Sequence, residues 1–123
     1  MAVIELSEEN FEETINSNDF VIVDFWAQWC GPCKSFAPTY EKISAEFPDI
    51  VFGKVNTEEQ QGIAGHFQIR SIPTLMMFRE QIIIYSEAGA LPEMAFKDIV
   101  ERASDLDMAK VREQIAEEQT KEA

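Results

Sequence analysis

Two cysteines, Cys30 and Cys33, stand close together in the run WCGPCK, and they are the only cysteines of the chain. In a reducing compartment such a pair is more often redox-active or metal-binding than a structural cross-link. Two thiols at this spacing can form a disulfide and reopen it, so the pair stores two electrons without a bound cofactor. Thiol–disulfide exchange is therefore the first chemistry that the sequence indicates.

The position of the pair between two predicted elements favours this chemistry. Residues 20–26 predict a buried strand, because both of its faces are apolar, and residues 32–47 predict a helix with Pro32 in its first turn. Free amide groups and the helix dipole at such a junction stabilise an anion, so we expect the pKa of the Cys30 thiol to lie below the roughly 8.5 of a free thiol. Cys33, deeper in the helix, would then resolve the mixed disulfide that Cys30 forms with a substrate.

Three other interpretations of the pair stay open. A structural disulfide closing so short a loop would stabilise the fold by about 2 kcal/mol. A zinc or iron–sulfur site, within one chain or shared between chains, needs about four ligands, whereas the chain offers two thiols and His66. Two inert buried cysteines are the third alternative. For His66 itself we expect a surface position rather than a catalytic role.

The remaining chain predicts an α/β fold in one domain. Apolar runs predict further strands over residues 3–6, 50–55, 74–78 and 82–85, of which the last two form an antiparallel hairpin. Helices are expected over residues 7–16, with Ser7 as N-cap, over 57–65, where Thr57 to Gln60 form a capping box, and from Leu91 to about residue 103. Pro38 should kink the long helix after the cysteines.

Composition excludes several function classes. The chain has 123 residues with 10 Lys plus Arg against 23 Asp plus Glu, a net charge of −13. This charge argues against nucleic acid and against an anionic membrane surface as partners. No apolar run approaches the roughly 20 residues of a membrane helix. No Lys or Arg precedes Lys34, so a secretory signal is not indicated, and we expect a cytoplasmic protein.

Three runs of sequence closely resemble the thioredoxin family: VDFWAQWCGPCK from Val23, APTYEKISAEF from Ala37 and IRSIPTLMMF from Ile69. The resemblance covers about residues 3–104. It implies the thioredoxin fold, a central mixed sheet of five strands flanked by four helices, and an activity as a protein-disulfide reductase on disulfide-containing client proteins. It also implies a lowered thiol pKa, which thioredoxins are known for, and a monomer without bound cofactor that draws electrons from NADPH indirectly, through a thioredoxin reductase.

The resemblance assigns a role to two charged residues near the cysteines. Asp24 is the only charged residue of its strand, and burial there would raise its pKa. In the family the matching acid helps to take the proton from the resolving thiol, here Cys33, and Lys54 matches a lysine near that acid. The alternatives are an Asp24 that reaches solvent and a Lys54 that is only a solvated residue of its strand.

A substrate-binding rim is implied in the same way. Most X-Pro bonds are trans, but thioredoxins place a cis proline opposite the cysteines, so Ile72 and Pro73 are expected to pair with an extended substrate strand. A core position for Trp29 and a simple turn at Gly89 are the alternatives. The apolar rim around the two sulfurs would comprise Trp29, Gly31, Pro32, Gly89 and Ala90.

Two other functions remain possible at this stage. The fold could serve as a redox-regulated binding module in which the dithiol is incidental or switches a contact. The protein could also be an oxidase or isomerase, although Gly31-Pro32 between the cysteines resembles reductases, whereas oxidising relatives commonly have a His in that gap.

The chain continues beyond the region of resemblance. Residues 105–123 place Met108, Val111 and Ile115 at helical spacing, which predicts a partly helical C-terminal extension after a thioredoxin domain of residues 1–104. This extension could pack on its own domain, join a dimer, contact a partner or remain solvated. The turn residues Arg79, Glu80 and Gln81 depart from the family, which commonly has a Gly there.

Overall fold

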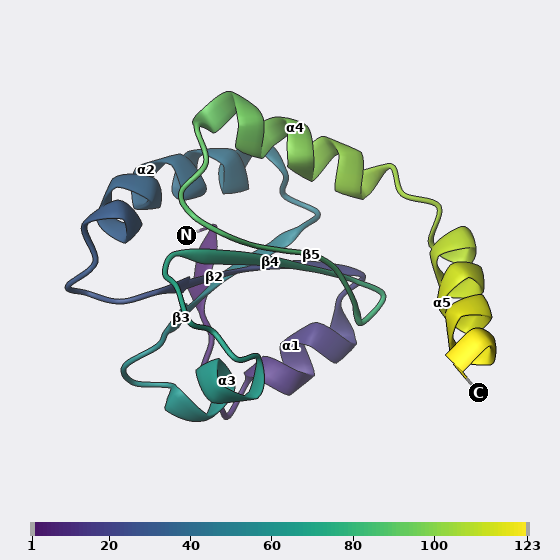
Figure 1. Cartoon of the computed structure of the whole chain (residues 1–123). Helices are drawn as coiled ribbons and strands as arrows, with labels where there is room; N and C mark the ends of the chain where they lie inside the picture. The colour runs from purple at the N-terminus through teal and green to yellow at the C-terminus, as the bar shows by residue number, and fades with distance from the viewer. Residues whose placement is uncertain (1, 123) are drawn as a thin grey trace.

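A five-stranded mixed sheet forms the centre of the computed structural model, which describes residues 2–122 (Figure 1). The strand order is β1-β3-β2-β4-β5. β1 and β2 run parallel to β3, whereas β4 is antiparallel to β2 and β5 is antiparallel to β4. The strands are β1 (Val3–Glu5), β2 (Phe20–Trp26), β3 (Val51–Asn56), β4 (Thr74–Arg79) and β5 (Ile82–Ala88).

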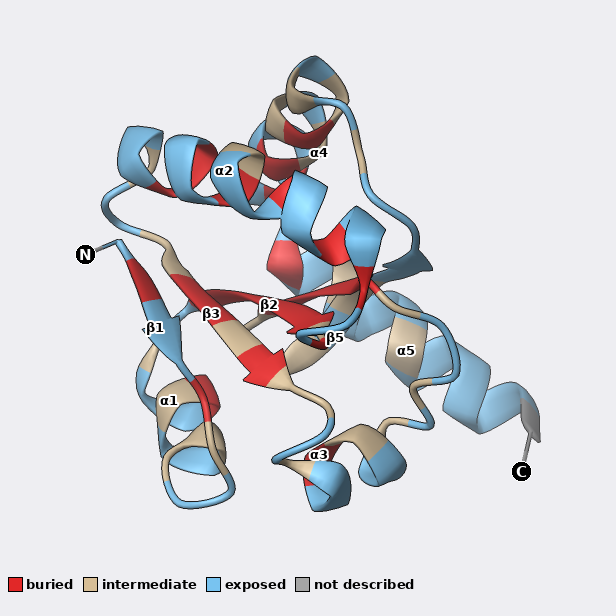
Figure 2. Ribbon diagram, turned by 90° about the vertical axis from the view of Figure 1, so that its left-hand side faces the viewer, coloured by how far each residue is buried: buried red, intermediate tan, exposed pale blue. Residues whose placement is uncertain are grey.

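Helices cover both faces of this sheet (Figure 2). α2 and α4 pack on one face, and α1 and α3 pack on the other. The helices are α1 (Phe11–Ser17), α2 (Gly31–Glu46), α3 (Gln61–His66), α4 (Glu93–Ser104) and α5 (Met108–Glu122). The expected thioredoxin fold is therefore confirmed, together with the additional C-terminal helix.

The central strand β2 divides the core into two layers because its side chains alternate between the faces. Ile22 packs beneath α2 and α4, where Tyr40 and Phe96 stack with ring centroids 5.7 Å apart. Val21 and Val23 pack beneath α1 and α3. All of β2 except Trp26 is buried, as its apolar sequence predicted. The strand is thus a rigid support for the residues that follow it, which include the two cysteines.

Two predicted helix starts are wrong. α1 begins at Phe11, because residues 7–10 form a turn in which the Asn10 side-chain oxygen accepts the Ser7 N–H at 2.7 Å. Asn10, and not Ser7, is the N-cap residue. α3 begins at Gln61, because the Thr57 hydroxyl donates to the Trp26 carbonyl at 3.1 Å instead of capping a helix.

The β4–β5 hairpin turns at Glu80 and Gln81, which have φ values of +50° and +71°. Positive φ at both central residues is the geometry of a two-residue type I′ turn, which usually contains Gly or Asn. The Glu80 N–H donates to the Asp19 carbonyl at 2.7 Å, and the Glu80 carboxylate pairs with Arg112 of α5. The unusual turn sequence is therefore held by contacts to the neighbouring elements.

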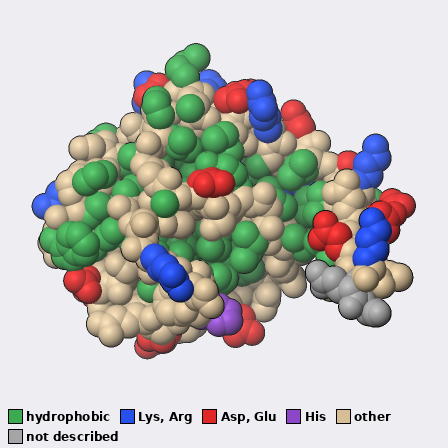
Figure 3. Space-filling model, in the orientation of Figure 1, with side chains coloured by type: hydrophobic (Ala, Val, Ile, Leu, Met, Phe, Trp, Pro, Cys, Tyr) green, Lys and Arg blue, Asp and Glu red, His purple; other side chains and the backbone are tan. Residues whose placement is uncertain are grey.

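α5 lies beside the hairpin and carries acidic and basic side chains on its outer surface (Figure 3). Met108 is buried, and Val111 and Ile115 are half-buried. Val111 and Ile115, together with Leu106, border a groove along Ile82, Ile83 and Ile84 of β5. Of the interpretations considered for this segment, packing on its own chain is the arrangement observed. In the part of the chain that the structure describes, no helix is long and apolar enough to cross a membrane.

Candidate redox site

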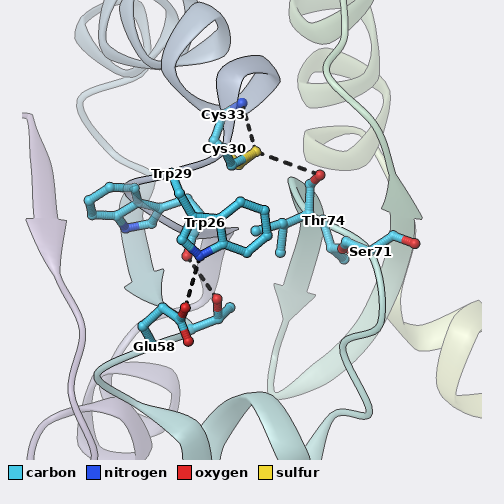
Figure 4. The surroundings of a disulfide bond; sticks show 9 residues. Trp26, Trp29, Cys30, Cys33, Glu58, Ser71 and Thr74 are labelled. Atoms are coloured by element: carbon cyan, nitrogen blue, oxygen red, sulfur yellow. Dashed lines mark hydrogen bonds between the residues drawn. A yellow bond between two sulfur atoms is a disulfide. The ribbon is translucent and has the colours of Figure 1, made fainter.

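The two cysteines form a disulfide at the N-terminus of α2, with their Cα atoms 5.3 Å apart (Figure 4). Cys30 is the N-cap residue, and Gly31 and Pro32 begin the helix. Pro32 fits there because the first helical turn needs no N–H from it. Cys30 is 4% exposed and Cys33 is 2% exposed. Cys33 is therefore the more deeply buried cysteine, as expected for the resolving thiol, but the difference is small.

The sulfur of Cys30 lies where a helix amide points at it. The backbone N–H of Cys33 donates to Cys30 Sγ at 3.2 Å. The same sulfur lies 3.8 Å from the carbonyl oxygen of Ile72, across the gap between α2 and the start of β4. An N–H that points at the sulfur, added to the positive end of the helix dipole, stabilises the thiolate of the reduced protein.

The loop before β4 faces the disulfide with its backbone. The Ile72–Pro73 bond is cis, as the resemblance implied. Thr74 fixes this loop, because its hydroxyl donates to the Ser71 carbonyl at 2.5 Å. The carbonyl oxygen of Pro73 accepts a hydrogen bond from the Gly89 N–H at 2.8 Å. Gly89 has a φ of +109°, a conformation that glycine adopts without strain.

Trp29 lies on the surface beside the disulfide and is 69% exposed, so its interpretation as a core residue is excluded. Its indole N–H donates to Glu58 Oε1 at 2.8 Å, which orients the ring across the site (Figure 4). Gly31 and Pro32 are exposed in the first turn of α2, and Ala90, which follows Gly89, is also exposed.

A small cavity of about 100 Å³ lies behind Cys33 and is lined by Asp24, Trp26 and Lys54, among others. Asp24 is only 5% exposed, so its interpretation as a solvated residue is excluded. Burial raises the pKa of Asp24 to about 7, although the positive charge of Lys54 opposes part of this shift. Within residues 2–122, neither Asp24 Oδ1 nor Trp26 Nε1 has a hydrogen-bond partner.

Lys54 extends from β3 over the ring of Trp26, with Nζ 5.2 Å from the ring centroid. Asp24 and Lys54 are paired in register across β2 and β3. Nζ also lies 4.0 Å from Glu5 Oε1, and the Lys54 side chain is 36% exposed. The ammonium group therefore lies at the border between solvent and the cavity that Asp24 lines.

Sequence reasoning missed two residues that shape the site. Tyr40 lines the cavity behind Cys33, and its hydroxyl lies 2.7 Å from the Gly53 carbonyl oxygen and 3.0 Å from that of Ile22, to which it donates. Glu58 is the partner of Trp29. A Tyr among the apolar residues of an amphipathic helix was the only available signal for the first, and no signal pointed to the second.

The residues of the alternative metal-site interpretation do not converge. Within the described residues, no group of three or more His, Cys, Asp and Glu side chains could hold a metal ion. His66 is exposed at the end of α3, where its ring packs against Phe67 with centroids 4.8 Å apart. The two sulfurs are bonded to each other.

Comparisons with known proteins agree with this geometry. Residues 2–102 match the family model described as Thioredoxin. The chain is 52% identical to "Putative thioredoxin 2" of Streptomyces coelicolor, over 96% of this chain and 88% of that protein. It is 44% identical to "Thioredoxin" of Buchnera aphidicola from Acyrthosiphon pisum, over 80% of this chain and 94% of that protein.

Solved structures show the same fold. A thioredoxin of Plasmodium falciparum matches with a TM-score of 0.76 at 35% identity, over 80% of this chain and 97% of that chain. A mutant thioredoxin of Halobacterium salinarum matches with a TM-score of 0.78 at 28% identity, over 85% and 92% of the two chains. The cysteine pair at the start of α2 and these likenesses lead to one conclusion: this chain belongs to the thioredoxin family, oxidoreductases that act by dithiol–disulfide exchange and need no bound cofactor.

Proposed function

We propose that the protein is a reductase of protein disulfides in which Cys30 is the nucleophile and Cys33 the resolving thiol. The Cys30 thiolate attacks one sulfur of a client disulfide, and the other client sulfur leaves as a thiolate. Cys33 then attacks Cys30 Sγ, which releases the second client sulfur and forms the Cys30–Cys33 disulfide. The client gains two electrons and two protons. The observation that carries this assignment is the Cys33 N–H directed at Cys30 Sγ.

Asp24 and Lys54 serve the second step. Cys33 must lose its proton before it attacks, and Asp24 is a buried carboxyl group that lines the same cavity. A carboxyl group with a pKa of about 7 exchanges protons readily at neutral pH. The cavity is large enough for water, so Asp24 takes the proton of Cys33 through water, while the positive charge of Lys54 partly lowers the pKa of Asp24 that burial raises.

Clients bind as an extended segment across the loop before β4. The Ile72 carbonyl lies within 3.8 Å of the attacking sulfur, so a strand that pairs with the Ile72 backbone brings its own disulfide to Cys30. Pro73 has no N–H and fixes the shape of this loop. The apolar rim that receives the client side chains comprises Trp29, Gly31, Pro32, Gly89 and Ala90.

The electron source and the cellular setting complete the proposal. A thioredoxin reductase restores the dithiol with electrons from NADPH, and the protein works as a monomeric electron carrier in the cytoplasm, apart from nucleic acid and membranes. The functional domain is residues 1–104, with residues 105–123 as a C-terminal extension. The match of residues 2–102 to the family model supports this division.

Reduction of insulin in the presence of dithiothreitol tests the proposal. The wild-type chain should accelerate precipitation of the insulin B chain, and Cys30→Ser should abolish the acceleration. If the wild type is no faster than Cys30→Ser, the reductase assignment fails. Cys33→Ser should instead trap clients as mixed disulfides on Cys30, which can be recovered with the protein from a lysate. Recovery of such adducts with Cys30→Ser in place of Cys33→Ser would reverse the two roles.

The NADPH route is tested separately with a bacterial thioredoxin reductase. Oxidation of NADPH, followed by its absorbance, should require the reductase, this chain and insulin together. A rate that does not depend on this chain would exclude the proposed electron source without affecting the assignment of the cysteines.

A further inference from the structure

A second and larger cavity lies on the sheet face that carries α1 and α3, and Figures 1 and 2 show these two helices on that face. We call it the α1–α3 cavity. It has a volume of about 420 Å³, which falls in the range of cavities that bind ligands in proteins. It shares no lining residue with the cavity behind Cys33. Binding in the α1–α3 cavity would therefore use residues other than those that line the cavity at the cysteines.

Three phenyl rings, together with Ile15 and Ile63, form the apolar part of the α1–α3 cavity. Phe11 lies 5.6 Å from Phe67 and 6.2 Å from Phe78, measured between ring centroids, and Phe67 lies 5.9 Å from Phe78. Phe78 is buried, whereas Phe11 and Phe67 are half-buried and reach the cavity from its two sides. The rings offer an apolar surface to an inserted side chain, and aromatic faces also attract cations.

The rim of the cavity carries acidic side chains. Glu8 and Glu12 line it, and the Glu8 carboxylate lies against Gly62 of α3, where His66 lines it as well. Both carboxylates are exposed, and within residues 2–122 neither forms a salt bridge. Glu9, next to Glu8 in the sequence, is a further exposed acidic residue. The cavity thus combines an aromatic floor with an acidic rim.

We propose that the α1–α3 cavity docks a basic amphipathic segment of a partner protein. One large apolar side chain of that segment lies on the three phenyl rings, and a neighbouring Lys or Arg pairs with Glu8 and Glu12. Charge complementarity selects this occupant: a second copy of the chain carries a net charge of −13 itself, and a neutral apolar segment would desolvate the carboxylates without pairing them. The overall charge of the chain also attracts basic partners before contact.

A synthetic peptide provides the probe. We would titrate the full, isotope-labelled chain with a short peptide that carries one Phe between Lys residues and follow the backbone amide shifts by NMR. The shifts should concentrate in α1 and α3 and weaken as salt is raised, because the carboxylates are exposed. Two control peptides, one with Glu in place of Lys and one with Ser in place of Phe, should bind less tightly.

Two variants test the carboxylates. Glu12→Gln should weaken binding of the peptide about two- to fivefold, the range of an exposed ion pair. Glu13→Gln is the matched control, because Glu13 is exposed on the same helix but does not line the cavity, and it should leave the affinity unchanged. Gly62→Ala places a methyl group against the Glu8 carboxylate and should also weaken binding, while Ala in a helix preserves the fold.

Several results would overturn the proposal. Equal effects of Glu12→Gln and Glu13→Gln would show only attraction by the general negative charge. Peptide shifts centred on Trp29 or on α5 would place the contact elsewhere. Shifts in α1 and α3 that depend on protein concentration without peptide would identify a second copy as the occupant. We expect Glu12→Gln to reduce insulin at the wild-type rate. The peptide-binding result therefore stands or fails separately from the redox assignment.

Discussion

The backbone N–H of Gly89 donates to the carbonyl oxygen of Pro73 at 2.8 Å, which joins the segment after β5 to the loop that faces the disulfide. This bond depends on the φ of +109° at Gly89, a value that L-residues rarely adopt. The shape of the client-binding rim is therefore tied to a glycine that makes no side-chain contact itself.

Replacing this glycine tests the connection. Gly89→Ala should lower the free energy of unfolding by about 1–3 kcal/mol, because the new side chain strains the backbone. It should also raise the KM for insulin more than it lowers kcat. Unfolding in urea and steady-state reduction measure the two effects. Gly65→Ala is the control, since Gly65 has no positive φ and an added Cβ meets nothing within 4 Å. Equal effects of both variants would contradict the prediction.

The acidity of Cys30 is the second prediction. In the reduced Cys33→Ser chain, the backbone N–H of residue 33 remains, so the pKa of Cys30 should still lie below the roughly 8.5 of a free thiol. The rate of alkylation by iodoacetamide as a function of pH gives this pKa directly. A cysteine in a short unstructured peptide is the reference, and a Cys30 no more acidic than that peptide would remove the basis of the proposed mechanism.

Burial of Asp24 makes the stability of the oxidised protein pH-dependent. The pKa is about 7 in the folded chain against 3.8 for the unperturbed group, so between these values the folded state binds more protons than the unfolded state. Stability should therefore fall as pH rises through this window. Above it, Asp24→Asn should be more stable than the wild type by up to roughly 4 kcal/mol, and below pH about 4 the two should nearly coincide.

Urea unfolding across this pH range measures the difference. Asp49→Asn is the control, because Asp49 is exposed and forms no salt bridge within the described residues, so its replacement should change the stability little. A constant offset between the wild type and Asp24→Asn at all pH values would show that Asp24 does not titrate in this window. If Asp24 also takes the proton of Cys33, Asp24→Asn slows resolution of the mixed disulfide at neutral pH in single-turnover measurements.

The hydroxyl of Tyr40 gives the fourth prediction. It lies within hydrogen-bond distance of the carbonyl oxygens of Ile22 and Gly53 on two neighbouring strands, and its single hydrogen bonds one of them at a time, so it holds β2 and β3 to α2 beside the active site. Tyr40→Phe should lower the free energy of unfolding by about 1–2 kcal/mol through loss of this bond. Tyr85→Phe, at a half-buried residue of β5, should cost less. If Tyr40→Phe lowers the free energy of unfolding no more than Tyr85→Phe does, the Tyr40 hydrogen bond does not stabilise the fold as predicted.

The hairpin turn offers a stabilising change. Gln81 has a φ of +71°, so Gln81→Gly should relieve strain and raise the free energy of unfolding by about 0.5–1 kcal/mol. Ser86→Gly in β5 serves as the control and should instead destabilise, because glycine weakens a strand interior. A loss of stability in Gln81→Gly would mean that the side-chain bond from Gln81 to the Asn16 carbonyl outweighs the backbone strain.

Much of the fold followed from local patterns, and most errors came from hydrogen bonds that patterns do not record. The apolar run of residues 20–26 predicted β2 with its observed ends. Ser7 and Thr57 are good capping residues, yet the Ser7 N–H donates to the Asn10 side chain and the Thr57 hydroxyl donates to the Trp26 carbonyl instead. At the site, the motif located both cysteines, and the resemblance indicated the cis bond that residue statistics alone disfavour. The hydrogen bond from Trp29 to Glu58 joins residues 29 positions apart, so no periodic pattern in the sequence could predict it.

α5 also has a consequence for how the molecule behaves at high concentration. β5 is the last strand of the sheet and pairs on one side only, so its outer backbone groups are a template on which a foreign strand could assemble. Its three consecutive isoleucines would make such assembly favourable, and Val111 and Ile115 lie alongside them. A chain that ends before Met108 should retain its dithiol chemistry but become prone to aggregation, because α5 would no longer lie beside the apolar edge strand β5.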